Sequence, residues 1–173
     1  FEALLANLEA DGRLDLWLAV GLVGLYGLRP SELAVMRLDD DGKLYVGGQV
    51  KRDAKAIEQG TEKPERLVKA LDLNGSGGLG KRMALLWDNG KGQIKLPLAV
   101  RNEIARVEEK NTFKEVGAAF SQLLTRYRYW KILVKKTPGL IPYSLRHGWA
   151  WRAHKNSEKQ LHYSQASALL GHT

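Results

Sequence analysis

Two arginine motifs lie far apart in the sequence, and each could aim a guanidinium group at a phosphate. The segment GLYGLRPSEL, residues 24–33, places Arg29 in a tight junction between two predicted helices, with Glu32 in the first turn of the second. The segment PYSLRHGWAWRAH, residues 142–154, places Arg146 near the start of another helix. Planar guanidinium groups neutralise and orient phosphate oxygens, and they stabilise the extra charge of a transition state. Because each motif alone also fits an ordinary surface arginine, the prediction depends on their combination.

The final residues of the sequence, ALLGHT at 168–173, indicate a short apolar helix, a glycine and then a histidine. A left-handed glycine commonly ends a helix and explains Gly171, whereas His172 needs another reason. In order along the chain, GLRPSEL, a strand-borne lysine, Y-x-L-R-H and L-G-H resemble the catalytic domain of the tyrosine recombinases, also called phage integrases. The resemblance covers nearly the whole chain.

The resemblance implies a role for each matching side chain. Arg29 and Arg146 would be the two phosphate-binding arginines of this family. Lys51, which closes LYVGGQVK, would be the general acid that protonates the 5′-hydroxyl leaving group, and Lys63 in GTEKPERLV is the alternative. A lysine can serve this role only if burial or nearby positive charge lowers its pKa, and the arginines could supply that charge.

The resemblance also covers the remaining phosphate ligands and the nucleophile. His172 matches the histidine that donates a hydrogen bond to the phosphate. Tyr143 stands where the family usually has a histidine; a phenol with a pKa near 10 is a poor general base at neutral pH, although it can donate to a phosphate oxygen. The nucleophile of the family is a tyrosine, which we expect beyond Thr173, roughly two to three helical turns after His172.

The reaction of this family sets the expected partners. Its tyrosine attacks a DNA strand to form a 3′-phosphotyrosyl bond, without a metal, a cofactor or an external energy source. The resemblance therefore implies site-specific DNA recombination, duplex DNA as partner, and self-association on DNA into a synaptic multimer. It implies a cytoplasmic, nucleoid-associated protein of bacterial or phage origin. Residues 1–173 would be the catalytic domain, without the family's N-terminal DNA-clamping domain and without the nucleophile segment.

The charge distribution independently favours a nucleic-acid partner. The chain of 173 residues has a net charge of +8. Residues 126–160 carry nine basic side chains and a single acidic one, interleaved with tyrosine and tryptophan, a pattern typical of nucleic-acid binders. Cysteine is absent, which excludes disulfides and thiolate metal sites, and no apolar run is long enough to span a membrane.

The elements that must position these motifs are mostly helices. Apolar spacing and breaker residues predict a helix at 14–25 ended by Gly27, and a second helix from Pro30 through SELAVMRL. Strands are predicted at 44–50, 66–73 and, as a short third strand, 93–98, and further helices at 99–110, 114–136, 144–154 and 163–170. We therefore expect one mainly α domain with a small antiparallel β-sheet (α+β), and the resemblance implies the integrase-like DNA breaking-rejoining fold.

A glycine-rich segment first suggests nucleotide binding. GSGGLGKR, residues 75–82, matches G-x-x-x-x-G-K, but Arg82 stands where the motif needs a serine or threonine for Mg²⁺. The preceding RLVKALDL has the pattern of a hairpin strand rather than a buried parallel strand. We interpret the segment as a flexible turn.

Two other functions remain compatible with the sequence. The first is a DNA-binding relative that keeps the fold and the charge but has lost cleavage. The second is a plain helical interaction module with structural arginines, which predicts no DNA affinity and no salt dependence, whereas phosphate contacts make log K fall with log salt.

Overall fold

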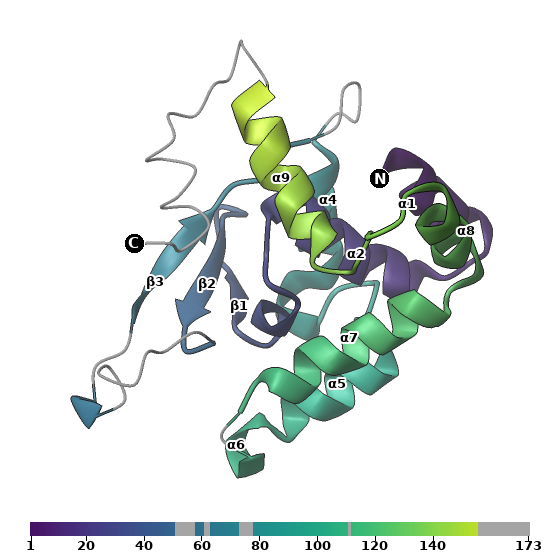
Figure 1. The fold of residues 1–173 in the computed structure, drawn as a ribbon. Helices are drawn as coiled ribbons and strands as arrows, with labels where there is room; N and C mark the ends of the chain where they lie inside the picture. Colours follow the sequence, from purple (N-terminus) through teal and green to yellow (C-terminus); the bar gives the residue numbers. More distant parts are fainter. Residues whose placement is uncertain (51–57, 61–62, 73–77, 111, 156–173) are drawn as a thin grey trace.

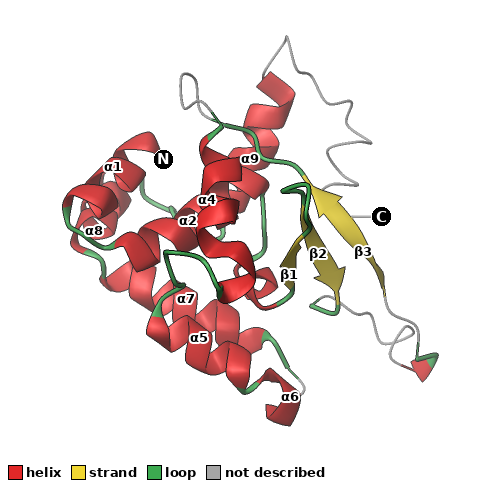
Figure 2. Ribbon diagram, turned by 180° about the vertical axis from the view of Figure 1, so that it is seen from behind, coloured by secondary structure: helices red, strands yellow, loops and turns green. Residues whose placement is uncertain are grey.

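A computed structural model describes residues 1–50, 58–60, 63–72, 78–110 and 112–155 of the chain. Helices dominate, and one three-stranded antiparallel sheet lies to one side of them (Figures 1 and 2). The predicted fold class, mainly α with a small antiparallel β-sheet, is confirmed at this level.

The core forms around α2 (Leu14–Tyr26), which confirms the helix predicted at 14–25. Every residue of α2 from Leu16 onward is buried, because α1 (Glu2–Ala10), α4 (Leu79–Trp87), α7 (Lys114–Arg126) and α9 (Ser144–Lys155) all pack against it. A helix that is apolar on all sides is stable only when it is enclosed in this way. α2 is therefore the central helix of the core, and the candidate site lies at the C-terminal end of α2.

The sheet has the strand order β1-β2-β3, with β1 (Met36–Leu38), β2 (Leu44–Gly48) and β3 (Lys63–Val68). The predicted antiparallel pairing is confirmed, because Leu44 and Val46 of β2 pair with Val68 and Arg66 of β3. The predicted bounds of the second strand, 66–73, are wrong: the strand begins earlier, at Lys63, and ends at Val68. Leu44, Val46 and Val68 are buried, as the two-residue alternation of a one-sided sheet requires. The hairpin thus ties the strand that carries Arg66 to the helical core.

The predicted helix over SELAVMRL is wrong in its second half. η1 (Pro30–Ala34) is a single 3-10 turn, after which the chain extends into β1. β1 pairs antiparallel with β2, from Met36 opposite Val46 to Leu38 opposite Leu44. Pairing within the sheet outweighs the helix propensity of these residues, which is a weak preference.

The third strand predicted at 93–98 is also wrong. The Ile94 backbone N–H donates to the Leu86 carbonyl at the end of α4, at 3.1 Å, and not to a strand. Leu96 is buried and Ile94 packs against the same core, so the apolar side chains of this segment belong to the core although its backbone bends and forms no strand. Pro97, which lacks the N–H that a ladder needs, then precedes α5 (Leu98–Ala105).

The glycine-rich segment contains a helix that the sequence analysis missed. Residues 79–82, interpreted as part of a flexible turn, form the start of α4, whose N-cap Gly78 has a left-handed φ of +82°. The buried residues of α4 follow helical spacing: Gly80, Met83, Ala84 and Trp87. The Gly80 backbone N–H donates to the Asp72 carboxylate at 2.8 Å, so a carboxylate occupies the helix N-terminus where a nucleotide phosphate would bind.

Two predicted helices are each divided. The helix predicted at 99–110 consists of α5 and α6 (Val107–Lys110), separated at Arg106. The helix predicted at 114–136 consists of α7 and α8 (Arg128–Lys136), because Tyr127 between them is extended. The Tyr127 hydroxyl donates to the Asp11 carboxylate at 2.6 Å, which fastens this break to the turn after α1.

The last described helix, α9, confirms the helix predicted at 144–154. Its fully buried Trp149 packs with Leu71 and Ala153, and the Trp149 indole N–H donates to the Lys69 carbonyl just after β3, at 3.2 Å. α9 is therefore fixed against both α2 and the end of the sheet. The helix predicted at 163–170 lies outside the described residues.

Candidate active site

The turn after α2 determines where Arg29 lies. Gly27 ends α2 in the left-handed conformation with φ +69°, which suits glycine because it has no Cβ. Arg29 itself is extended, and Pro30 begins η1 with the fixed φ that a first helical turn requires. The junction is short and has a glycine and a proline at fixed backbone angles, so the Arg29 backbone has little freedom.

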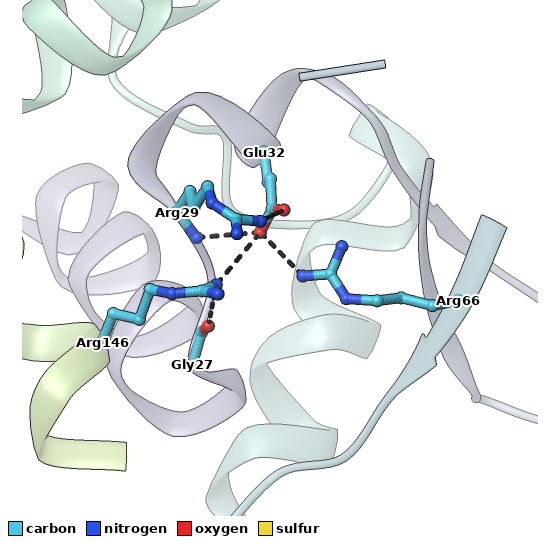
Figure 3. Close-up of polar contacts among 5 residues, drawn as sticks. All are labelled: Gly27, Arg29, Glu32, Arg66 and Arg146. Carbon is cyan, nitrogen blue, oxygen red and sulfur yellow. Dashed lines mark hydrogen bonds and ion pairs between the residues drawn. The ribbon is translucent and has the colours of Figure 1, made fainter. Parts of the chain in front are cut away.

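The carboxylate of Glu32 is the centre of the site, and only 1% of this side chain is exposed. Arg29 donates to it twice, from its backbone N–H to Oε2 at 2.8 Å and from Nη1 to Oε1 at 2.9 Å. Arg66 of β3 donates from Nη2 to Oε2 at 3.0 Å. Nη1 of Arg146, on α9, lies 3.7 Å from the same oxygen. Figure 3 shows these arginines reaching Glu32 from three separate elements; we call Arg29, Glu32, Arg66 and Arg146 the arginine cluster.

Arg146 is the most deeply buried cation of the cluster, with 3% of its side chain exposed. Its Nη1 donates to the carbonyl of Gly27 at 2.8 Å, at the C-terminal end of α2 (Figure 3). Burial, followed by the positive charge of Arg29, lowers the pKa of Arg146 to about 10, against the opposing effect of Glu32. The guanidinium therefore stays charged at neutral pH although it is buried.

Arg66 is a member of the cluster that the sequence analysis missed. It lies on β3 opposite Val46, which is buried, and two residues before the buried Val68. Side chains two apart on a strand share a face, so the alternation in RLVKALDL already indicated that Arg66 faces inward with Val68. An arginine on the inward face of a strand needs a buried acid, and Glu32 meets that need.

Glu32 stays ionised because its arginine neighbours outweigh its burial. Burial raises the pKa of Glu32, but the hydrogen bond and charge of Arg66, followed by those of Arg29, produce a net lowering. Three guanidinium groups thus surround one carboxylate, and these four side chains together carry a net charge of +2. An excess of positive charge with low exposure attracts a multiply charged anion more strongly than the same charge in open water.

The structure brings together some of the predicted site residues. Arg29 and Arg146 meet at Glu32, and Tyr143 lies in the turn directly before α9, where its charge interaction with Arg146 opposes part of the lowering of that arginine's pKa. The Tyr143 ring also packs edge-on against His147, with centroids 5.2 Å apart. Lys63, the alternative general acid, begins β3, the strand that carries Arg66. Lys51 and His172 lie outside the described residues.

A second arginine of α9 also binds the end of α2. Nη2 of Arg152 donates to the carbonyl of Gly24 at 2.6 Å, and its guanidinium lies 5.3 Å from the centre of the Phe1 ring. Burial lowers the pKa of Arg152. Because Arg146 binds Gly27 in the same way, two cations of α9 hold the negative end of the α2 dipole. This pairing fixes the rotation of α9, and with it the direction in which Arg146 points.

The basic stretch that suggested nucleic-acid binding does not form one exposed face. Its α9 arginines, Arg146 and Arg152, turn inward to the carbonyls of α2. The basic side chains of α8 are instead exposed, and we call them the α8 basic face: Arg128, Lys131, Lys135 and Lys136. Figure 1 shows α8 beside α1, on the far side of the helical layer from the sheet. The stretch therefore supplies two arginines that face inward and a separate solvated surface.

Within the described part of the chain, no group of three or more histidine, aspartate or glutamate side chains is arranged to hold a metal ion. No helix in those same residues is long and apolar enough to cross a membrane. Comparisons with protein-family models, curated proteins and solved structures found no match to this chain.

Proposed function

We propose that this chain is the catalytic domain of a site-specific DNA recombinase, and that the arginine cluster binds the phosphate at which the DNA strand is broken. The observation that carries the proposal is the convergence of Arg29 and Arg146 at Glu32. These two arginines belong to the two motifs on which the resemblance to the tyrosine recombinases depends. Motifs far apart in the sequence that meet at one buried carboxylate are a stronger indication than either motif alone.

The charge of the cluster suits this chemistry. A phosphodiester gains negative charge on its non-bridging oxygens when a nucleophile attacks, so donors fixed in advance around those oxygens lower the barrier. Arg146 is held by Gly27 and Arg29 by Glu32, so neither guanidinium has to reorganise when the transition state forms. The excess of two positive charges compensates the charge that develops on the phosphate.

The proposed reaction needs further groups, which the resemblance supplies. A tyrosine beyond Thr173 loses its hydroxyl proton to solvent, and its oxygen forms a bond to phosphorus while the bond from phosphorus to the 5′ oxygen breaks. The leaving 5′ oxygen takes a proton from Lys51 or Lys63, and His172 and Tyr143 donate hydrogen bonds to the phosphate. Rejoining reverses these steps with the 5′-hydroxyl of another strand. Assembly of several protomers on DNA is part of this proposal.

The second candidate is a DNA-binding relative that no longer cleaves, and Tyr143 is the observation that favours it. A tyrosine in place of the usual histidine leaves that position without a base that works at neutral pH. Both candidates predict DNA binding through phosphate contacts, so they differ only in whether a covalent bond forms.

The test is a covalent-adduct assay with the gene's complete protein product and labelled duplex DNA. The recombinase proposal predicts a protein–DNA adduct that survives denaturation, carries the label through a 3′-phosphotyrosine, and disappears when the C-terminal tyrosine is changed to phenylalanine. DNA binding without any adduct would favour the inactive relative. Failure to bind DNA at low salt would contradict both candidates and favour a helical interaction module.

A further inference from the structure

We propose that Arg66 is a positioning residue of the arginine cluster: it holds the Glu32 carboxylate in the orientation that fixes Arg29 and Arg146, and it does not itself bind the phosphate. This inference rests on the proposed function, because it assigns Arg66 a task in the same site. Arg66 lies on the strand β3, outside both arginine motifs of the resemblance.

The geometry around the carboxylate supports this role. Arg29 binds Oε1 through Nη1 at 2.9 Å, and Arg66 binds Oε2 through Nη2 at 3.0 Å. With one guanidinium on each oxygen, the carboxylate plane cannot rotate without breaking a charge-assisted hydrogen bond. Oε2 is thereby kept facing Arg146, whose Nη1 lies 3.7 Å away. Removal of Arg66 would take away the charged donor to Oε2, the oxygen that faces Arg146, although the neutral backbone N–H of Arg29 would still donate to it at 2.8 Å.

The electrostatics point in the same direction. Burial raises the pKa of Glu32, and Arg66 supplies the largest opposing contribution, through its hydrogen bond and its charge. A protonated Glu32 would lose the negative charge that holds the Arg29 guanidinium. By keeping Glu32 ionised, Arg66 therefore also preserves the hydrogen bond between Arg29 and Glu32.

The elements around Glu32 carry other ionisable groups. These include Arg29 on η1, Arg146 and Tyr143 on the α9 side, and Lys114 and Glu115 in the first turn of α7, which packs against η1.

A double-mutant cycle separates positioning from direct binding. Four proteins are compared: the wild-type chain, Arg66→Met, Glu32→Gln, and the variant with both changes. Sulfate is the probe, because it is a tetrahedral dianion whose charge does not change between pH 4 and pH 8, and its affinity is measured by calorimetry at low ionic strength. A second readout is the ¹³C chemical shift of the Glu32 carboxyl group, followed from pH 8 downward in the wild type, Arg66→Met and Arg66→Lys.

If Arg66 acts through Glu32, Arg66→Met weakens sulfate binding by roughly tenfold in the wild-type background, about 1.4 kcal/mol. The same change has an effect of about twofold or less when Glu32 is already glutamine, because contacts that act as one network are not additive. The Glu32 carboxyl titrates at a higher pH in Arg66→Met, because the largest effect that lowers its pKa is gone. Arg66→Lys, which keeps the charge, restores most of this shift.

The matched control is Arg37→Met. Arg37 is a half-exposed arginine on β1 that binds Glu65 on β3, so its removal changes the net charge equally without touching Glu32. We expect sulfate affinity and the Glu32 titration to stay at their wild-type values in this variant. Circular dichroism and thermal melting of each variant show that the proteins compared are folded.

Each outcome has a distinct meaning. An equal loss of sulfate affinity in both backgrounds would show that Arg66 contacts the anion, which overturns the positioning role while the proposed phosphate site stands. If the wild-type chain binds no sulfate, the phosphate site itself fails, and the Glu32 titration still tests Arg66. A Glu32 titration that is unchanged in folded Arg66→Met overturns the inference in either case.

Discussion

The arginine cluster and the α8 basic face each present several cations, but in opposite environments. In the cluster, Glu32 and Arg146 are almost fully buried, and hydrogen bonds hold the guanidinium groups to Glu32 and to the Gly27 carbonyl. On α8, the cationic side chains are exposed to solvent along one helix. Buried charges keep most of their interaction energy, whereas exposed charges are screened by water and salt. The cluster is therefore suited to precise chemistry, and the α8 basic face to salt-dependent attraction.

Because the arginine cluster is buried and the α8 basic face is exposed, the two regions also contribute differently to the stability of the fold. Because the cluster removes charges from water, its members depend on one another, and the loss of one weakens the charge compensation of the others. The α8 cations depend on no such partner. The comparison thus predicts that substitutions in the cluster affect stability and the proposed chemistry together, and that substitutions on α8 affect only the proposed affinity for DNA.

The largest effect on stability is expected from Glu32→Gln. The change preserves shape but removes the charge that compensates Arg146, Arg66 and Arg29, so we expect the free energy of unfolding to fall by about 3–5 kcal/mol. Chemical denaturation at pH 7 measures this difference. The control is Glu65→Gln, which removes the acid of the exposed pair with Arg37 and should leave the denaturation midpoint unchanged. Equal denaturation midpoints for Glu32→Gln and the wild type would show that the charges of the arginine cluster do not depend on Glu32, which contradicts the contrast drawn with the α8 basic face.

A smaller effect is expected at the break between α7 and α8. Tyr127→Phe removes the hydroxyl that binds Asp11, and we expect a loss of about 1 kcal/mol at neutral pH. Burial and the bond to Asp11 raise the pKa of Tyr127 to about 12, so the hydroxyl contributes fully below the ordinary phenol pKa near 10. The difference between wild type and variant should therefore shrink as the pH rises from about 10 through about 12. A difference that does not depend on pH would show that lost packing, and not the hydrogen bond, causes the destabilisation.

The smallest effect on the folded protein is expected from a double change on the α8 basic face, Lys131→Ala with Lys135→Ala. Both side chains are exposed, so the thermal midpoint should not change. If both contact phosphates, the slope of log K against log salt for duplex DNA becomes less negative by about 2, as fluorescence anisotropy at several salt concentrations can measure. A slope equal to that of the wild type would exclude α8 from the DNA surface.

The sequence predicted the central parts of this framework and missed others for identifiable reasons. The helix at 14–25 and the hairpin of β2 and β3 follow from apolar spacing and alternation, the two most direct signals in a sequence. β1 was missed because Met36 to Leu38 favours a strand only when β2 is present to pair with it. α4 was missed because Gly78 and Gly80, at its N-terminal end, resemble a loop when the residues they pack against are unknown.

The candidate site was also predicted only where the signal is local in the sequence. The motifs around Arg29 and Arg146 were visible because each keeps its residues close together in the sequence. Arg66 has no such motif, and its role depends on the fold bringing β3 to η1. The inward alternation with Val68 was the available signal, and it indicates the face of the strand without identifying the acid. Likewise, the burial of Arg146 and Arg152 against α2 could not be predicted from the basic composition of residues 126–160.

The most direct test of the central claim is the single-turnover rate of DNA cleavage by Arg146→Lys in the gene's complete product, at saturating DNA. Lysine keeps the buried charge but cannot reproduce the planar fork that binds Gly27 and reaches Glu32. We predict a rate about 10²–10³-fold below the wild type, the cost of losing one fixed donor to the transition state, with nearly unchanged DNA affinity. Cleavage at the wild-type rate by the folded variant would contradict the assignment of the arginine cluster as the phosphate site.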